Sequence, residues 1–354
     1  MSVTGHLEFD NHEAVCFFND SATGLRAIVA LHSTTLGPAF GGCRMYSYAS
    51  EDAALTDALR LSRGMSYKNA LAGLSCGGGK AVIIGNPASA KTPDLLRAFG
   101  KAVETLGGRY VTAEDAGIGT ADVAVIREAT EHVRKLPLDD GGNPSPCTAW
   151  GVFKGMDAAW RHIEGRGLEG ALVAIEGLGG VGMELARLLY EAGAKLVVND
   201  TDSRKVSDAV GRFGAREGQA ERLHAEQVDI YSPCAMGGTL NERTIPELRA
   251  RLVAGGANNQ LAAPSDGELL MERGVTYCPD YVINAGGVLS VPLAGEVYDR
   301  QRALDRAAGL VPVLLKVLAT AEREKVPTQL AADRLAESRL AGVAPRGRPD
   351  GSAR

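Results

Sequence analysis

One segment, residues 171–200, constrains the fold of this chain more than any other. Two apolar runs, ALVAIEG and KLVVND, flank a glycine-rich turn and the amphipathic stretch VGMELARLLYEAG. The apolar runs have the length and composition of buried strands, and the stretch between them has helical spacing. A strand, a helix and a strand in this order build a parallel, doubly wound sheet. The sequence therefore predicts a Rossmann-type domain in the second half of the chain.

The turn inside this segment, residues 177–182, has the pattern Gly-x-Gly-x-x-Gly. The pattern is informative here because it follows a predicted strand and opens a predicted helix. The first glycine permits the tight turn, the second lets the backbone approach a pyrophosphate, and the third lets helix and strand pack closely. The residues expected to bind a dinucleotide are Gly177, Leu178, Gly179, Gly180, Val181, Gly182 and Asp200. The alternative is that the glycines serve only the turn.

The choice of dinucleotide depends on Asp200, which ends the second strand near the offset of about 20 residues at which an acidic side chain binds an adenosine ribose. A carboxylate here would repel a 2′-phosphate, so we expect NAD rather than NADP. Arg204 lies close enough in the sequence to leave NADP open.

The length of 354 residues is sufficient for two domains with separate hydrophobic cores. The segment PLDDGGNPSPCT, residues 137–148, is rich in Pro, Gly and Asp and is the best candidate for their connection. We expect an α/β domain over residues 1–136, a dinucleotide-binding domain over 145–325, and a helix over 326–342 that can pack back on the first domain. Residues 343–354 are expected to form a disordered tail.

A second glycine-rich stretch, SCGGGKAVIIG at residues 75–85, does not match a phosphate-binding P-loop. Position 74 is leucine where that motif needs glycine, Ala81 replaces the required Ser or Thr, and an apolar strand follows instead of a helix. We therefore expect a glycine-rich turn with Lys80 at the mouth of the strand. Close approach of the backbone there can desolvate the Lys80 amine and lower its pKa towards the range useful for acid–base chemistry.

Two further charged residues of the first domain are candidates for chemistry. Ser50 can cap a helix that is expected to end near Lys68, and a lysine in that place is often only a solvated partner of the helix dipole. Asp115 lies in RYVTAEDAGIG, a short strand that runs into a loop. We expect Asp115 to be a partner for Lys80, with loop capping as the alternative.

The composition excludes several other classes of function. Lys and Arg total 38 against 43 Asp and Glu, a net charge of −5, and no basic run predicts a nucleic-acid partner. The N-terminal stretch is acidic and no apolar run approaches the ~20 residues of a membrane span, so we expect a cytoplasmic protein without a membrane partner. The six cysteines lack a Cys-x-x-Cys pair and the six histidines lack metal spacing. Reduced thiols and no metal site are therefore expected.

In their order along the chain, these residues and their surroundings resemble the Glu/Leu/Phe/Val amino-acid dehydrogenase family, and most closely its leucine-specific members. Several long segments in order are more specific than any single glycine pattern. The matching segments are TTLGPAFGGCRM (34–45), LRLSRGMSYKNALAGL (59–74), GGGK (77–80), GRYVTAEDAG (108–117), GNPSPCTAWGVF (142–153), GLGGVG (177–182), SPCAMGG (232–238), AGGANNQL (254–261) and YCPDYVINAGGV (277–288).

The resemblance implies a mixed-sheet substrate domain and a Rossmann-type domain with a cleft between them, in a homo-oligomer of two to eight copies. It also implies the NAD-dependent, reversible oxidative deamination of an L-amino acid to a 2-oxo acid and ammonium. Lys80 would activate water, Asp115 would shuttle protons to and from nitrogen, and Lys68 would hold the substrate carboxylate. The further residues that the resemblance implies are Gly41, Gly42 and Met65 for the substrate, Thr148 and Asn284 for the cofactor, and Asn259 for both.

The residue before the Gly-Gly pair, Phe40, bears on the substrate. Glutamate-specific members place a lysine there, and without it the substrate carboxylate would be left unpaired at a cost of several kcal/mol. Ala113 and Val288, with Val291, match the branched-chain members, so we expect leucine, valine or isoleucine. Phe40 departs from the usual leucine and leaves phenylalanine and tryptophan as alternatives. A non-catalytic NAD-binding sensor is the alternative from another class of protein. The presence of Lys68, Lys80 and Asp115 argues against it, because binding NAD needs none of them.

Overall fold

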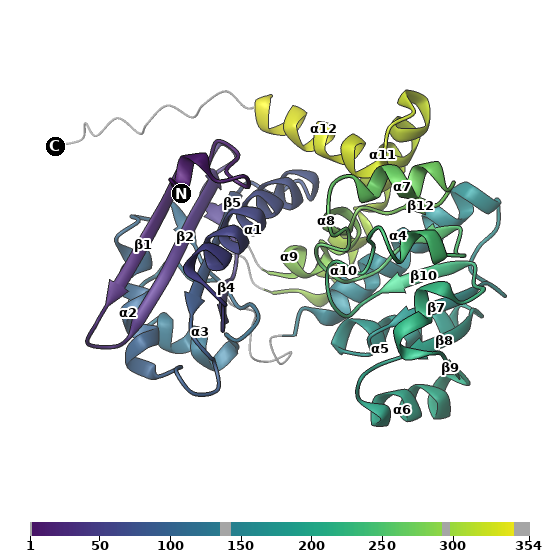
Figure 1. The fold of residues 1–354 in the computed structure, drawn as a ribbon, viewed down its shortest axis with the longest axis horizontal. Helices are drawn as coiled ribbons and strands as arrows, with labels where there is room; N and C mark the ends of the chain where they lie inside the picture. Colours follow the sequence, from purple (N-terminus) through teal and green to yellow (C-terminus); the bar gives the residue numbers. More distant parts are fainter. Residues whose placement is uncertain (1, 135–142, 292–297, 343–354) are drawn as a thin grey trace. The chain divides into compact units, whose positions relative to one another are not determined.

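The computed structural model describes residues 2–134, 143–291 and 298–342. The chain divides into unit 1, residues 1–142 with 336–354, and unit 2, residues 143–335 (Figure 1).

The division into units falls inside the expected connection over residues 137–148, of which 137–142 lie outside the described residues. The expected tail over residues 343–354 also lies outside them. The second boundary falls inside α12 (Thr328–Ala341), so this helix contributes residues to both units.

Unit 1 is built on a mixed six-stranded sheet. Its path is β1-β2-β5-β3-β6, and β4 also pairs with β5. The pairs β1–β2 and β2–β5 are antiparallel, whereas β3 and β4 run parallel to β5 and β6 runs parallel to β3. The elements are η1 (Val3–Gly5), β1 (Ala14–Asp20), β2 (Leu25–Ser33), β3 (Ala39–Phe40), β4 (Cys43–Tyr46), α1 (Glu51–Leu71), β5 (Gly77–Ile84), α2 (Pro93–Glu104), β6 (Tyr110–Val111) and α3 (Thr120–Ile126).

Alternate residues of the central strands belong to two hydrophobic cores, because successive side chains of a strand point to opposite faces. On one face, Ile28, Ala30 and Val82 pack with apolar residues of α1. On the other face, Ala81 and Ile83 pack with apolar residues of α2 and α3. Lys80 alternates with Ala81 and therefore lies on the face that α1 covers.

Helix α1 begins as the sequence predicts and ends later. Ser50 is the N-cap, and its hydroxyl accepts a hydrogen bond from the backbone N–H of Ala53 at 3.1 Å. The sequence predicts an end near Lys68, and α1 continues three residues further to Leu71, so Lys68 lies in its last turn. Gly73, with a φ of 70°, supplies the left-handed residue beyond the helix end.

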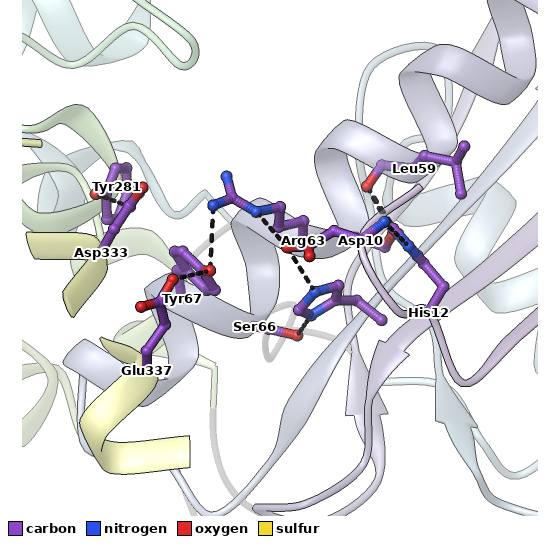
Figure 2. A network of polar contacts seen from close by, with 11 residues as sticks. Asp10, His12, Leu59, Arg63, Ser66, Tyr67, Tyr281, Asp333 and Glu337 are labelled. Carbon is purple, nitrogen blue, oxygen red and sulfur yellow. Dashed lines mark hydrogen bonds and ion pairs between the residues drawn. The ribbon is translucent and has the colours of Figure 1, made fainter. Parts of the chain in front are cut away.

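A polar network lies along α1 (Figure 2). Arg63 Nε donates to Asp10 at 2.8 Å, and Asp10 lies 3.6 Å from His32 Nε2, whose Nδ1 lies 2.8 Å from the hydroxyl of Ser66. Tyr67 donates to the carboxylate of Glu337 at 2.8 Å. The network therefore joins α1 to β2 through Ser66 and His32, and to the second half of α12 through Tyr67 and Glu337.

Unit 2 has the parallel, doubly wound sheet that the sequence predicts. The strand order is β12-β11-β10-β7-β8-β9, and every pair is parallel. The strands run outward from β7 to β9, and the chain then returns to place β10 on the other side of β7. This reversal is the topological switch point of the sheet, where ligands bind in such folds.

The elements of unit 2 place the predicted strand, helix and strand at β7, α5 and β8. The bounds are α4 (Ser145–Glu164), β7 (Leu172–Glu176), α5 (Gly180–Glu191), β8 (Lys195–Asn199), α6 (Ser203–Phe213), β9 (Arg216–Glu217), η3 (Ala220–Ala225), β10 (Ile230–Pro233), η4 (Ile245–Glu247), β11 (Leu252–Val253), α7 (Asp266–Glu272), β12 (Thr276–Tyr277), α8 (Asp280–Ile283), α9 (Gly286–Ser290), α10 (Arg300–Ala308) and α11 (Val311–Glu324). The predicted fold class, a mixed-sheet α/β domain followed by a Rossmann-type domain, is confirmed.

Candidate active site

The glycines that precede Lys80 form part of strand β5, and the expected turn was wrong. A β-carbon on Gly77 would collide with the carbonyl oxygen of Ser33, and one on Gly78 would collide with the backbone nitrogen of Ser66. The missing side chains therefore let β5 lie directly against α1 and β2. This close packing places Lys80 in the middle of a buried strand rather than at its mouth.

Lys80 is 4% exposed, and its amine donates a hydrogen bond to the carboxylate of Asp115. Burial lowers the pKa of Lys80 to about 7, and the positive charges of Arg44 and Lys68 act in the same direction. The sequence-based expectation of a lowered pKa is thus confirmed. The carboxylate of Asp115 opposes this shift, because a neighbouring negative charge favours the charged form of the amine.

Asp115 is held by contacts on both of its sides. Its Oδ1 accepts a hydrogen bond from the backbone N–H of Ala116 at 2.6 Å and lies 3.5 Å from Nε of Arg44. Its backbone pairs with that of Ile118 in an isolated bridge. The carboxylate therefore lies between the amine of Lys80 and the guanidinium of Arg44.

Arg44 is a residue of this site that the sequence analysis missed. Its Nη1 donates to Asp57 of α1 at 2.9 Å, and Asp57 also accepts a hydrogen bond from the Tyr48 hydroxyl at 2.6 Å. One signal was present in the sequence, because Arg44 is a charged residue between the apolar residues Cys43 and Met45 of a short strand.

The other substrate residues predicted for unit 1 lie close to β5, to α1 and to the segment that precedes Asp115. A β-carbon on Gly41 would collide with the Gly79 carbonyl and would lie 3.2 Å from Cγ of Met65, and one on Gly42 would collide with the Glu114 carbonyl. Lys68 lies in the last turn of α1, and the carbonyl of Ala113 accepts a hydrogen bond from Cys43 at 2.9 Å. The structure therefore brings together, within unit 1, the predicted residues Gly41, Gly42, Met65, Lys68, Lys80, Ala113 and Asp115.

Phe40 is 3% exposed, and the guanidinium carbon of Arg134 lies 5.1 Å from the centre of its ring. This distance is within the range of a cation–π contact. Phe40 thus places an aromatic side chain, covered by a cation, directly before the Gly41–Gly42 pair.

In unit 2, the glycine loop has the packing that a dinucleotide site requires. Gly177 has a φ of 93°, and a β-carbon on Gly182 would collide with the carbonyl of Gly177. A β-carbon on Gly179 would meet no atom within 4 Å, so the first turn of α5 presents an open backbone surface. This geometry fits the approach of a pyrophosphate.

Asp200 follows β8 and accepts a hydrogen bond from the backbone N–H of Leu178 at 2.6 Å. Burial alone would raise the pKa of its carboxyl, but hydrogen bonds from the backbones of Asp202 and Leu178 and the nearby Lys205 hold that pKa below its ordinary value. Asp200 therefore places a negative charge at the end of β8, next to the glycine loop.

The predicted cofactor residues beyond the loop lie on further segments of unit 2. Asn284 donates to the carbonyl of Ala257 at 3.2 Å, whereas its buried Oδ1 has no hydrogen-bond partner among the described residues. A buried carbonyl without a partner fits a donor such as the carboxamide of a nicotinamide. Asn259, with a φ of 52°, donates its backbone N–H to Asp280 at 2.8 Å.

Contacts connect these segments to the glycine loop at the carboxyl ends of β7, β10 and β11. A β-carbon on Gly177 would lie 2.7 Å from that of Ala235, and one on Gly237 would lie 2.8 Å from the carbonyl of Asn259. Thr148 of α4 lies beside Gly287, where a β-carbon would approach its hydroxyl to 2.7 Å. Val288 belongs to α9, and Val291 is the residue that caps that helix.

The described parts of the chain contain no group of three His, Cys, Asp or Glu side chains arranged to hold a metal. All six cysteines are free thiols. None of the described helices has both the length and the apolar composition needed to cross a membrane.

Comparisons with known proteins agree with this architecture. Residues 12–132 match the family described as "Glu/Leu/Phe/Val dehydrogenase, dimerisation domain", and residues 199–294 match "Glutamate/Leucine/Phenylalanine/Valine dehydrogenase". Leucine dehydrogenase of Geobacillus stearothermophilus is 47% identical over 343 residues, which cover 96% of this chain and 94% of the relative. Valine dehydrogenase of Streptomyces coelicolor is 46% identical over 347 residues, covering 96% and 95%.

Among solved structures, L-tryptophan dehydrogenase from Nostoc punctiforme has a TM-score of 0.81 at 42% identity, covering 94% of this chain and 97% of that chain. The family match and the leucine and valine dehydrogenase relatives identify the chain as an amino-acid dehydrogenase with a nicotinamide cofactor. The chain belongs to the Glu/Leu/Phe/Val dehydrogenase family.

Proposed function

We propose that this enzyme catalyses the reversible, NAD-dependent oxidative deamination of leucine, valine or isoleucine. The α-carbon gives up a hydride to NAD and water replaces the amino group, which yields the 2-oxo acid, ammonium, NADH and a proton. The observation that carries the proposal is the buried Lys80 amine bonded to Asp115 in a member of an amino-acid dehydrogenase family. The relatives named leucine dehydrogenase and valine dehydrogenase support the substrate class.

The chain's own residues handle the proton transfers. A lysine with a pKa of about 7 is neutral in a large fraction of molecules at neutral pH, so it can take a proton from attacking water. Asp115, which accepts the hydrogen bond from Lys80, exchanges protons with the substrate nitrogen. Lys68 supplies a positive charge for the substrate carboxylate, and the backbone of Gly41 and Gly42 assists it.

A bound nicotinamide supplies the hydride acceptor. The open backbone at Gly179 fits its pyrophosphate, and the buried Oδ1 of Asn284 fits its carboxamide. The carboxylate of Asp200 favours NAD, because it would repel a 2′-phosphate. Arg204 supports the same choice, because its guanidinium already pairs with Asp202 at 2.9 Å.

An aromatic substrate is the second candidate. The aromatic side chain of Phe40 favours this candidate, and the L-tryptophan dehydrogenase of Nostoc punctiforme is 42% identical to this chain. Differences of methylene size are worth only about 1–3 kcal/mol in an apolar pocket. Relative kcat/KM values are therefore needed to rank the two classes.

The match of residues 12–132 to a dimerisation domain supports a homo-oligomer of two to eight copies, for which light scattering after gel filtration is the test. The cytoplasmic location stays a prediction.

The decisive experiment has two parts. A spectrophotometric panel of twenty amino acids with NAD and with NADP measures NADH or NADPH formation, and we expect the highest kcat/KM with a branched-chain amino acid and NAD. In the second part, Lys80→Ala should lower kcat by roughly 10²–10⁴ while NADH binding by fluorescence is retained. Lys101→Ala, which removes an exposed lysine of α2, is the matched control. Near-normal turnover of the Lys80 variant would contradict the proposed role.

A further inference from the structure

A surface cavity of about 640 Å³ in unit 2 is open to solvent, and its charged lining residues are four exposed arginines and one exposed glutamate. These residues are Arg222, Glu247, Arg249, Arg251 and Arg273. This local excess of positive charge contrasts with the net charge of −5 of the whole chain. The volume lies within the range of small-molecule pockets.

The cavity lies at the amino ends of the strands, whereas the cofactor loop lies at their carboxyl ends. Its arginines come from η3, from the turn before β11 and from the turn before β12, that is, from the amino ends of the strands. The glycine loop follows the carboxyl end of β7. In a parallel sheet the two ends are separated by the strand length, about 13 Å for the four residues of β10. A ligand in the cavity is therefore distinct from the nicotinamide dinucleotide.

Most of the arginines are held in place by one protein contact. Nη2 of Arg222 donates to Glu247 at 3.1 Å, Nη2 of Arg273 donates to the carbonyl of Leu248 at 2.9 Å, and Arg251 pairs with Glu164. Each guanidinium has five N–H donors, so each keeps several donors free for a ligand.

Arg249 has neither an ion pair nor a hydrogen bond from its side chain to any part of the chain that the structure describes. The one carboxylate in the cavity, Glu247, is neutralised by Arg222 and lies 3.4 Å from His224. An incoming anion would therefore meet a cavity in which unused guanidinium donors outnumber unpaired carboxylates.

We infer that this cavity binds a small molecule with a chain of phosphates, such as a nucleoside triphosphate or inorganic tripolyphosphate. Guanidinium groups bind phosphate oxygens in pairs, and arginines on three separate segments can contact successive phosphates. A single phosphate would engage only part of this set. Binding here would be separate from the dehydrogenase reaction.

The test is isothermal titration calorimetry of the full chain in saturating NADH, which fills the cofactor site. The probes are ATP, tripolyphosphate and orthophosphate. We expect ATP and tripolyphosphate to bind and orthophosphate to bind at least tenfold more weakly. Equal affinity for ATP and tripolyphosphate would indicate that the cavity recognises the phosphate chain alone. Tighter binding of ATP would indicate that the nucleoside also contacts the protein.

The double variant Arg249→Ala/Arg273→Ala should weaken binding of tripolyphosphate at least tenfold. The matched control, Arg161→Ala/Arg212→Ala, removes two arginines of the same unit that pair with Asp157 and Asp208 at 2.9 Å, and it should change the affinity less than twofold. Thermal unfolding and NADH affinity verify that both variants fold. Equal losses in both double variants, orthophosphate binding as tight as tripolyphosphate, or absence of binding would overturn the inference.

Discussion

Replacing Arg44 with methionine should raise the pKa of Lys80 without touching the amine itself. Arg44 lies 3.5 Å from the same carboxylate that Lys80 contacts, and its charge is the largest influence after burial that lowers the Lys80 pKa. Its side chain is 24% exposed, so its field is only partly screened by water. Methionine keeps much of the apolar stem and removes the charge.

The size of the effect follows from the geometry. Two cations that flank one carboxylate lie roughly 6 Å apart, and at an effective dielectric constant of about 20 their repulsion is roughly 3 kcal/mol. Partial exposure reduces this to about one pKa unit, or about 1.4 kcal/mol. A shift of the Lys80 pKa from about 7 to about 8 lowers the neutral fraction at pH 7 about fivefold.

The assay is the pH profile of kcat/KM for oxidative deamination. In Arg44→Met the acidic limb should move to higher pH by about one unit, with activity approaching that of the wild type at high pH. Arg44→Lys should restore most of the original limb. Arg26→Met, which removes an exposed arginine paired with Glu51 at 3.0 Å, is the control. A uniform loss of activity with an unmoved limb would refute the reasoning.

Three further predictions concern packing, pH and specificity. Gly78→Ala should destabilise unit 1 by about 1–3 kcal/mol in urea unfolding, because the new methyl group collides with Ser66. Gly64→Ala is the control, because Gly64 lies in open space on α1, and it should stabilise unit 1 by about 0.5–1 kcal/mol. Burial lowers the pKa of His32 to about 4, so stability should fall by roughly 3 kcal/mol as the pH drops from 6.5 towards 4, and His32→Gln should reduce this dependence. Phe40→Leu should raise kcat/KM for leucine relative to valine, and an unchanged ratio would contradict its role in the pocket.

The sequence predicted the elements whose signals are local. The strand, helix and strand around Gly177 follow from hydrophobic spacing and a glycine motif within 30 residues, and the structure has them as β7, α5 and β8. The start of α1 at Ser50 likewise depends on one cap and its first turn. Such features are visible in the sequence because neighbouring residues determine them.

The parts that sequence reasoning missed depend on long-range pairing. Three consecutive glycines favour a turn by local preference, yet in the structure they pair with β2 and β3 and pack against α1. The contact of Arg44 with Asp115 joins residues 71 positions apart in the sequence (115 − 44), and its contact with Asp57 joins a strand to a helix. No spacing rule within a single element identifies such partners.

The glycines and the lysine of β5 depend on each other for a physical reason. A charged amine inside a sheet is costly because it is removed from water, and this cost lowers the pKa of Lys80 to about 7. The amine is therefore neutral in a large fraction of molecules at neutral pH. That low pKa requires burial, and burial requires a backbone without side chains at Gly77 and Gly78 so that β2 and α1 can close over the strand. Larger residues at these two positions would open the packing and admit water. The pKa would then return towards its ordinary value of about 10.4, and the amine would be a cation at neutral pH, unable to act as a base.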